Sequence, residues 1–218
     1  MITALGVSLL LTACGNDKKE STTSTIDSTS STDDTGGTMS MDTMGNMNMG
    51  TASSMSAVMQ KGMEDMKAIP TTNNPDNDYA ALMKAHHMSA IEASQLQLSQ
   101  GSDQGIKRMA QKMLDDQQKE VAQFNTFLSG HSAHGGGDAF YKEVMSKMGT
   151  MSSAMDHSGS IDKQFVSMMI PHHQGAIDMS KAYLKAGAHE AQLKTLATNI
   201  IASQEKEIKE LKDWLAKN

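Results

Sequence analysis

An internal repeat constrains the fold of this chain more than any other feature. Repetition at a fixed period indicates that one structural unit occurs twice. We therefore expect residues 52–218 to form one domain from two related units, residues 52–131 and residues 138–218. A shift of 86 residues aligns His86-His87 with His172-His173 and Ala90-Ile91-Glu92 with Ala176-Ile177-Asp178, and after one extra residue in the second copy Gln117 aligns with Gln204 and Glu120 with Glu207.

Each copy is predicted to contain one short and two long helices. The long helices should span 77–100 and 103–129 in the first copy, and 162–186 and 190–217 in the second. Helix start signals support this, because Asp162 can cap the third of these helices and Ser102 or Asp103 the second. Aromatic residues make up only 4% of the chain and Met accounts for 21 of 218 residues, which favours helices over sheets. Two hairpins with apolar faces predict an all-α four-helix bundle.

The short helices are rich in methionine. Met-rich stripes at helical spacing are more often packing than ligands, because Met is an adaptable core residue. We therefore expect these stripes mainly to pack against the long helices, with metal ligation as the alternative. Their methionines are Met55, Met59, Met63 and Met66 in the first copy and Met145, Met148, Met151 and Met155 in the second.

The N-terminus resembles a bacterial lipoprotein signal. The apolar run from Ile2 to Leu11 is too short to span a bilayer, and Leu11-Thr12-Ala13-Cys14 closely resembles a lipobox. No Lys or Arg precedes the run, so the alternative is an apolar N-terminus without a signal. We expect residues 1–14 to be the signal peptide, Cys14 to be lipidated, and the mature protein to be anchored to a membrane outside the cytoplasm, in the periplasm or at the cell surface. As the single cysteine, Cys14 excludes an internal disulfide and a thiolate metal cluster.

Residues 15–51 are predicted to be a disordered linker, because Ser, Thr, Asp and Gly dominate and little apolar surface is available for burial. Its second part is Met-rich, although Gly and Asn make a helix there unfavourable. Core packing does not explain methionines in such a segment, so we expect them to bind a metal ion. They are Met39, Met41, Met44, Met47 and Met49.

The histidine pairs should meet polar partners across each hairpin. In the second copy, His173 and Gln204 are equally far from the turn near Ala188, with Glu207 one helical turn further on. In the first copy, His87 faces Gln117 in the same way. Adjacent residues differ by about 100° around a helix, so one histidine of each pair can bind metal while the other faces elsewhere. Which one binds is left open.

Methionines next to the histidine pairs complete the candidate ligands. Pairs at i, i+4 share a helix face, and the segment MMIPHHQGAIDM has Met on both sides of its histidines. Pro171 should kink this helix and mark the second copy as the more specialised site, since the first copy has Ala85 there. The candidate ligands are His172, His173, Met168, Met169, Met179, Gln204 and Glu207 in the second copy, and His86, His87 and Met83 in the first; His131 and His134 could share a further ion or lie in a solvated loop.

The softness of these ligands predicts the metal. Thioethers bind oxygen-preferring ions poorly and select Cu(I) or Ag(I), while imidazole also accepts Cu(II). We therefore expect a copper ion, with Cu(I) favoured and Cu(II) possible. The net charge of −6 provides no basic surface for nucleic acid, so a nucleic-acid partner is not expected.

The second copy resembles the bacterial domain of unknown function 305 family. The resemblance rests on MMIPHHQGAIDMS and ATNIIASQEKEIKELKDWL; it is strong over residues 160–218 and weaker over 76–129, where Lys84-Ala85 and Met88-Ser89 depart from the pattern. It implies an exported, ferritin-like four-helix bundle that binds copper, with ligands at His172, His173 and Met169. Equivalent roles for His86, His87 and Met83 are implied less strongly.

Three functions are compatible with these features. The first is an extracytoplasmic copper and silver binding protein for sequestration, resistance or transfer to a partner protein, acting by ligand exchange without catalysis. The second is a lipid-anchored helical bundle that binds a protein partner. The third, a ferritin-like di-metal oxidase, requires Glu-x-x-His motifs, and no Glu lies three residues before a His in this chain.

Overall fold

A computed structural model of the protein describes residues 54–151 and 158–218. Within these ranges the chain forms six helices and no strand: α1 (Met55–Ala68), α2 (Pro75–Gln100), α3 (Gln104–Gly130), α4 (Ala139–Met151), α5 (Ile161–Lys185) and α6 (Ala191–Leu215). The signal peptide with Cys14, the linker with its Met39–Met49 run, and Met155 lie outside the described residues. The predictions for these segments stay predictions.

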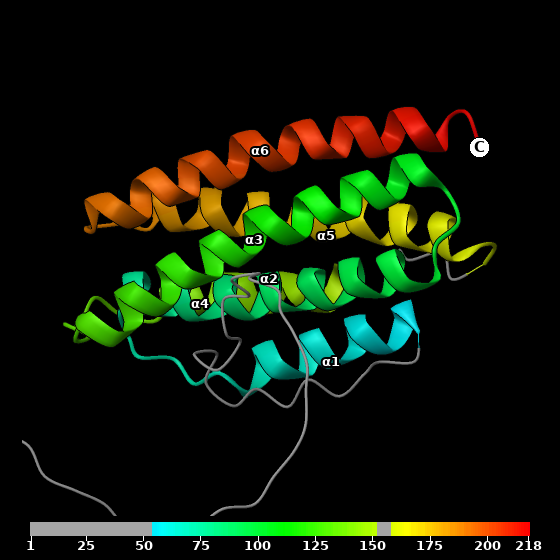
Figure 1. Ribbon diagram of the computed structural model, residues 1–218. Helices are drawn as coiled ribbons and strands as arrows, with labels where there is room; N and C mark the ends of the chain where they lie inside the picture. The colour runs from blue at the N-terminus through cyan, green and yellow to red at the C-terminus, as the bar shows by residue number, and fades with distance from the viewer. Residues whose placement is uncertain (1–53, 152–157) are drawn as a thin grey trace, which may run out of the picture. The chain divides into compact units, whose positions relative to one another are not determined.

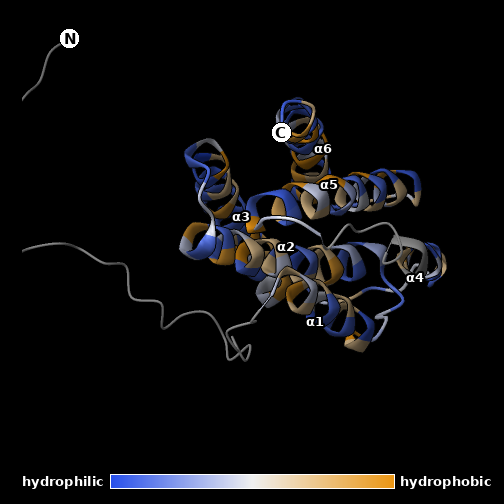
Figure 2. Ribbon diagram, turned by 90° about the vertical axis from the view of Figure 1, so that its right-hand side faces the viewer, coloured by the Kyte–Doolittle hydropathy of each residue, from blue (hydrophilic) through white to orange (hydrophobic). Residues whose placement is uncertain are grey.

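The four long helices form two hairpins, and each hairpin is preceded by a short helix, as predicted. α2 pairs with α3 and α5 pairs with α6, and α2 and α5 pack against each other. Figures 1 and 2 show α2 and α5 in a central layer, with α3 and α6 on one side and α1 and α4 on the other. The all-α fold of two related hairpins is therefore confirmed. None of the described helices is both long enough and apolar enough to cross a membrane.

The histidine pairs divide the hydrophobic core into two parts. Along α2, Met83 and Ala85 belong to one buried cluster and Ala90 and Ala93 to another, with His86 and His87 between them. α5 passes the same two clusters in the opposite order, with its own histidine pair between them. The central helices therefore place four imidazoles in one polar layer between two apolar clusters.

Two buried aspartates tie the hairpins together. Asp162 accepts hydrogen bonds from the backbone N–H groups of Ser102 and Asp103, at the start of α3. Its repeat equivalent Asp76 accepts bonds from the N–H groups of His189 and Glu190, at the start of α6. Each aspartate thus supplies a carboxylate to the exposed N–H groups at the start of a helix in the other repeat.

The predicted role of Asp162 as the cap of its own helix is wrong. Ser160 caps α5, because its hydroxyl accepts a bond from the N–H of Lys163. Asp162 lies in the first turn of α5, where its side chain reaches the start of α3 instead. The prediction for α3 is confirmed, since the Asp103 side chain accepts a bond from the N–H of Ile106.

Gly62 allows α1 to approach α2 closely. A Cβ atom at Gly62 would lie 2.5 Å from the Cβ of Ser89, so Gly62→Ala must push the two helices apart. Overpacking of this kind costs about 1–3 kcal/mol, and we expect urea denaturation to show a loss of that size. The control is Gly130→Ala, at the end of α3, where a Cβ would meet no atom within 4 Å. A loss no larger than that of the control would show that α1 is not held this closely.

Candidate metal site

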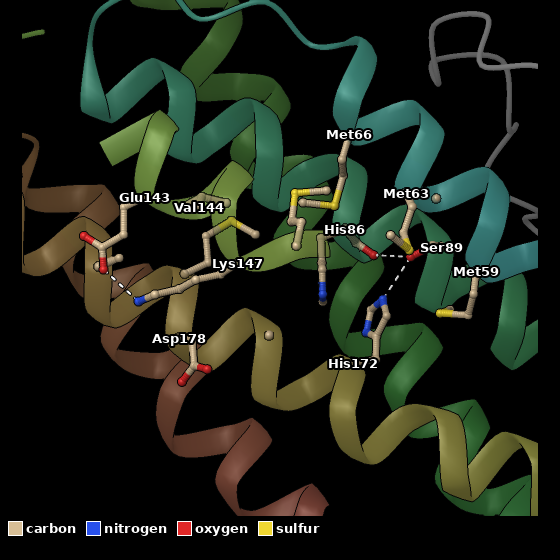
Figure 3. A pocket seen from close by; sticks show the side chains of 15 residues that line it. Met59, Met63, Met66, His86, Ser89, Glu143, Val144, Lys147, His172 and Asp178 are labelled. Atoms are coloured by element: carbon tan, nitrogen blue, oxygen red, sulfur yellow. Dashed lines mark hydrogen bonds and ion pairs between the residues drawn. The ribbon is translucent and has the colours of Figure 1, made fainter. Parts of the chain in front are cut away.

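A cavity of about 130 Å³ lies between α1, α2, α4 and α5. It is lined by five methionines and two of the four histidines. Figure 3 shows the cavity with His86 from α2, His172 from α5 and three methionines from α1. The five methionines are Met59, Met63 and Met66 on α1, Met148 on α4 and Met179 on α5.

The methionines give the cavity a soft set of sulfur donors. Four of them are buried, whereas Met63 is partly exposed. Nowhere in the described chain are three side chains among His, Cys, Asp and Glu placed to hold one metal ion together. The donors that do gather around one space are thioethers and imidazoles, which suit Cu(I) and Ag(I).

His172 is held in one orientation by Ser89. The Ser89 hydroxyl donates its only proton to the backbone carbonyl of His86, at 2.7 Å, and lies 2.9 Å from Nε2 of His172. Nε2 of His172 must therefore carry the proton and donate it to the serine oxygen. The lone pair is then on Nδ1, which has no hydrogen-bond partner among the described residues. Ser89 thus leaves one nitrogen of His172 available as a ligand.

His86 has no such partner. Its ring is tilted by 32° relative to that of His172, with a centroid distance of 3.7 Å, yet neither ring nitrogen hydrogen-bonds to any described residue. The repeat explains this difference, because the position equivalent to Ser89 is Gly175, which has no hydroxyl. A buried imidazole without a partner is costly, and a bound metal ion would satisfy it.

Burial keeps both pocket histidines neutral. It lowers the pKa of His86 and His172 well below 6.5, and the charges of neighbouring histidines lower both pKa values further. A neutral imidazole retains a lone pair for a metal ion, whereas a protonated one does not.

The lowered pKa values predict acid sensitivity of the metal-free protein. In the unfolded chain these histidines bind protons below pH 6.5, while in the folded protein they resist protonation. The free energy of unfolding should therefore be highest above pH 6.5 and fall as the pH decreases, by up to about 1.4 kcal/mol per pH unit for each histidine. Urea denaturation across this range measures the slope. The double variant His86→Leu, His172→Leu should lose most of it, and an unchanged slope would contradict the prediction.

The other two histidines face the opposite side, toward α3 and α6. Nε2 of His173 lies 3.0 Å from Oε2 of Glu207, one helical turn beyond Gln204, which the hairpin geometry placed level with His173. Nε2 of His87 lies 2.7 Å from Oε2 of Glu120, at an angle unfavourable for a hydrogen bond. Burial would raise the pKa of Glu207, but its contacts with His173 and Lys112 lower it overall. The Glu207 carboxylate is therefore ionised, and its Oε2 accepts a hydrogen bond from the Nε2–H group of His173.

The structure places the remaining predicted ligands away from the cavity. Met83, Met168 and Met169 are buried within the hydrophobic clusters, and Gln204 and Glu207 line a second cavity between α3 and α6. Their role as ligands stays a prediction.

The other sequence features near the site are also placed by the structure. α5 remains helical on both sides of Pro171. His131 and His134 follow α3, and the centroids of their rings are 5.5 Å apart. Nδ1 of His131 also lies 3.6 Å from Oε1 of Glu190.

The cavity methionines on α1 and α4 were not among the predicted ligands. Met59, Met63 and Met66 follow a spacing of i, i+4 and i+7, which is equally typical of a packing stripe. The sequence signal that could have identified them is the use of Met, rather than Leu, at nearly every apolar position of α1. Their position opposite His86 and His172 follows only from how α1 packs on the central helices.

Comparison with known proteins places the chain in a family. The model of a domain of unknown function (DUF305) matches residues 10–128 and again residues 129–215. The chain belongs to this family. The second match corresponds to the second repeat.

Solved structures of two proteins resemble this fold. A silver-bound form of CopM is 26% identical, with a TM-score of 0.51 over 65% of this chain and 95% of that chain. A Cu(I)-bound form of CopM, 24% identical with a TM-score of 0.50, covers 65% of this chain and 96% of that one. A DUF305 fragment from Deinococcus radiodurans, 20% identical with a TM-score of 0.51 over 68% of this chain and all of that one, supports the fold alone.

One curated relative also matches. The uncharacterized protein L153 of Acanthamoeba polyphaga mimivirus is 46% identical over 54 residues, which is 25% of this chain. The match spans about a third of that relative's length, at 35%.

Proposed function

We propose that this protein binds Cu(I), and Ag(I) as its analogue, in the cavity between α1, α2, α4 and α5. The observation that carries the proposal is the meeting of five thioethers and two neutral imidazoles around one space. Both imidazoles have at least one ring nitrogen without a partner in the described residues. Thioether and imidazole ligands favour a soft monovalent ion over harder divalent ions. The silver-bound structure of CopM, a similar protein, supports this assignment.

The ion enters and leaves by ligand exchange, without a catalytic step. Glu143 and Asp178 line the cavity together with Lys147, whose ammonium lies 2.7 Å from Glu143 (Figure 3). These carboxylates attract a cation to the opening, and the partly exposed Met63 offers a first sulfur ligand. The ion then exchanges thioethers until His86 and His172 bind it. Soft ligands that are replaced one at a time suit storage and transfer.

We further propose that the protein acts outside the cytoplasm, anchored to a membrane through Cys14. Residues Met39–Met49 would capture copper on the linker and pass it to the cavity or to a transfer partner. This part of the proposal rests on the lipobox-like sequence and on the Met run. Thioethers are suitable ligands in an oxidising compartment, where paired thiols form disulfides.

Competition between the full-length protein and a Cu(I) chelator tests the proposal. We expect binding tighter than micromolar, and a marked loss in the double variant His86→Leu, His172→Leu. Replacement of all five methionines in the Met39–Met49 run by leucine separates the linker from the cavity, since it should leave the tight site in place. Binding no tighter than micromolar would contradict the proposal and favour a protein-interaction role instead.

A further inference from the structure

The backbone of α1 lies directly over the Ser89 side chain on α2. A Cβ atom at Gly62 would come within 2.5 Å of the Cβ and 2.9 Å of the Oγ of Ser89, so any larger residue there would collide with the serine. Ser89 is 6% exposed, and both residues line the cavity of the proposed copper site. The close approach of α1 at Gly62 therefore confines the Ser89 hydroxyl to its observed position.

In this position the hydroxyl has two polar contacts. It donates to the backbone carbonyl of His86, at 2.7 Å, and accepts from Nε2 of His172, at 2.9 Å (Figure 3). Burial lowers the pKa of His172 well below 6.5, so the ring is neutral and only one of its two nitrogens carries a proton. With that proton on Nε2, the lone pair that can bind a metal ion is on Nδ1.

The second repeat has no counterpart of this serine. Gly175 occupies the equivalent position and also lines the cavity, but it has no hydroxyl that could reach His86. Nδ1 and Nε2 of His86 both lack a hydrogen bond to any described residue. The two cavity histidines therefore differ, because a hydroxyl from the other repeat orients His172 and none orients His86.

We propose that Ser89 and Gly62 are positioning residues that direct His172 to bind the metal ion through Nδ1. Gly62 confines the hydroxyl, the hydroxyl keeps the proton on Nε2, and the Nδ1 lone pair is left for the ion. α1 also carries three of the five cavity methionines, so the helix that brings these thioethers also sets the imidazole. The inference rests on the proposed function, because it assigns a ligand atom within the same cavity.

Nuclear magnetic resonance of the whole chain with ¹⁵N-labelled histidine tests the inference, with Ag(I) as the probe. In the metal-free protein, the ¹⁵N shifts should place the proton of His172 on Nε2. When Ag(I) is bound, the magnetic silver nucleus should split the Nδ1 signal of His172 through the new bond. Splitting of the Nε2 signal, or of His86 signals alone, would overturn the inference and leave the proposed function in place. No effect of Ag(I) on any histidine signal would overturn both.

Ser89→Ala distinguishes positioning from a structural role, because it removes only one oxygen atom. Without the hydroxyl, His172 should populate both neutral tautomers. Its Ag(I) affinity should fall by about twofold to tenfold, because only part of the molecules then present the Nδ1 lone pair. A single Nε2-protonated tautomer and the parent's Ag(I) affinity in this variant would show that Ser89 does not position His172.

Two further variants complete the test. Gly62→Ala keeps the hydroxyl but displaces it, so it should also shift His172 toward a mixture of tautomers; an unchanged His172 spectrum would overturn the role of Gly62. Ser94→Ala is the matched control, since Ser94 is a fully buried serine on the same helix that does not line the cavity. It should leave both the tautomer of His172 and the Ag(I) affinity as in the parent.

Discussion

Replacing Met59, Met148 and Met179 together by leucine should weaken Cu(I) binding by about a thousandfold, equivalent to about 4 kcal/mol. These residues bring one thioether each from α1, α4 and α5 to the cavity. Their loss leaves a Cu(I) ion with the two histidines and two methionines of α1. Leucine has nearly the volume of methionine, and such exchanges in a core cost less than about 1.5 kcal/mol each. Chelator competition measures the affinity, and circular dichroism verifies the fold.

The matched control uses three of the four methionines that the sequence predicted as ligands beside the histidines. Met83, Met168 and Met169 are buried in the hydrophobic clusters and do not line the cavity. The triple variant Met83→Leu, Met168→Leu, Met169→Leu changes the same number of thioethers, and we expect its Cu(I) affinity to stay close to that of the parent. If Cu(I) affinity fell only in this second triple variant, the ion would bind beside these three methionines rather than in the cavity.

Asp162→Ala should reduce the free energy of unfolding by about 3 kcal/mol. The Asp162 carboxylate accepts bonds from two backbone N–H groups at the start of α3, from the Ser102 hydroxyl and from Gln97. Burial would raise its pKa, but these hydrogen bonds lower it overall, so the group is ionised in the folded protein. Removal leaves the buried Gln97 amide and the part-buried N–H groups of Ser102 and Asp103 without this acceptor, and it cancels a favourable charge at a helix N-terminus. Urea denaturation measures the loss.

The repeat provides a comparison for this prediction. Asp76→Ala should have an effect of similar size. The Asp76 carboxylate accepts hydrogen bonds from two backbone N–H groups at the start of α6 and from the hydroxyl group of Tyr183. Asp115→Ala, at an exposed position on α3, should change stability by less than about 0.5 kcal/mol. If Asp162→Ala behaved like Asp115→Ala, the aspartates would not hold the two hairpins together.

Much of the fold could be predicted because the helical signals are local. The spacing of apolar residues and the repeat located all four long helices to within about two residues at each end, a margin typical of helix boundaries. Equal distances from the turn placed Gln204 level with His173 in the antiparallel hairpin, whereas the contact in the structure is with Glu207, one helical turn further on. The role of Asp162 could not be predicted from local spacing, because its carboxylate bonds to the start of a helix 60 residues away in the sequence.

The candidate site could be predicted only in part. The sequence by itself determined that two histidine pairs lie at the centre of the bundle and that the available donors are soft. Adjacent histidines lie about 100° apart on a helix, so the pairs must face two directions, but the sequence does not assign those directions. Packing assigns them: α1 and α4 cover the side of His86 and His172, whereas α3 and α6 bring Glu120 and Glu207 to the side of His87 and His173.

The same limit applies to the methionines. A packing stripe and a ligand stripe have the same spacing on a helix, because both require residues on one face. Only the tertiary structure shows that Met83 and Met169 lie among apolar side chains, while Met59 and Met179 border a cavity whose two imidazoles each have a ring nitrogen without a partner in the described residues. The sequence determined which donors this protein has, and the packing of six helices decided which of them meet.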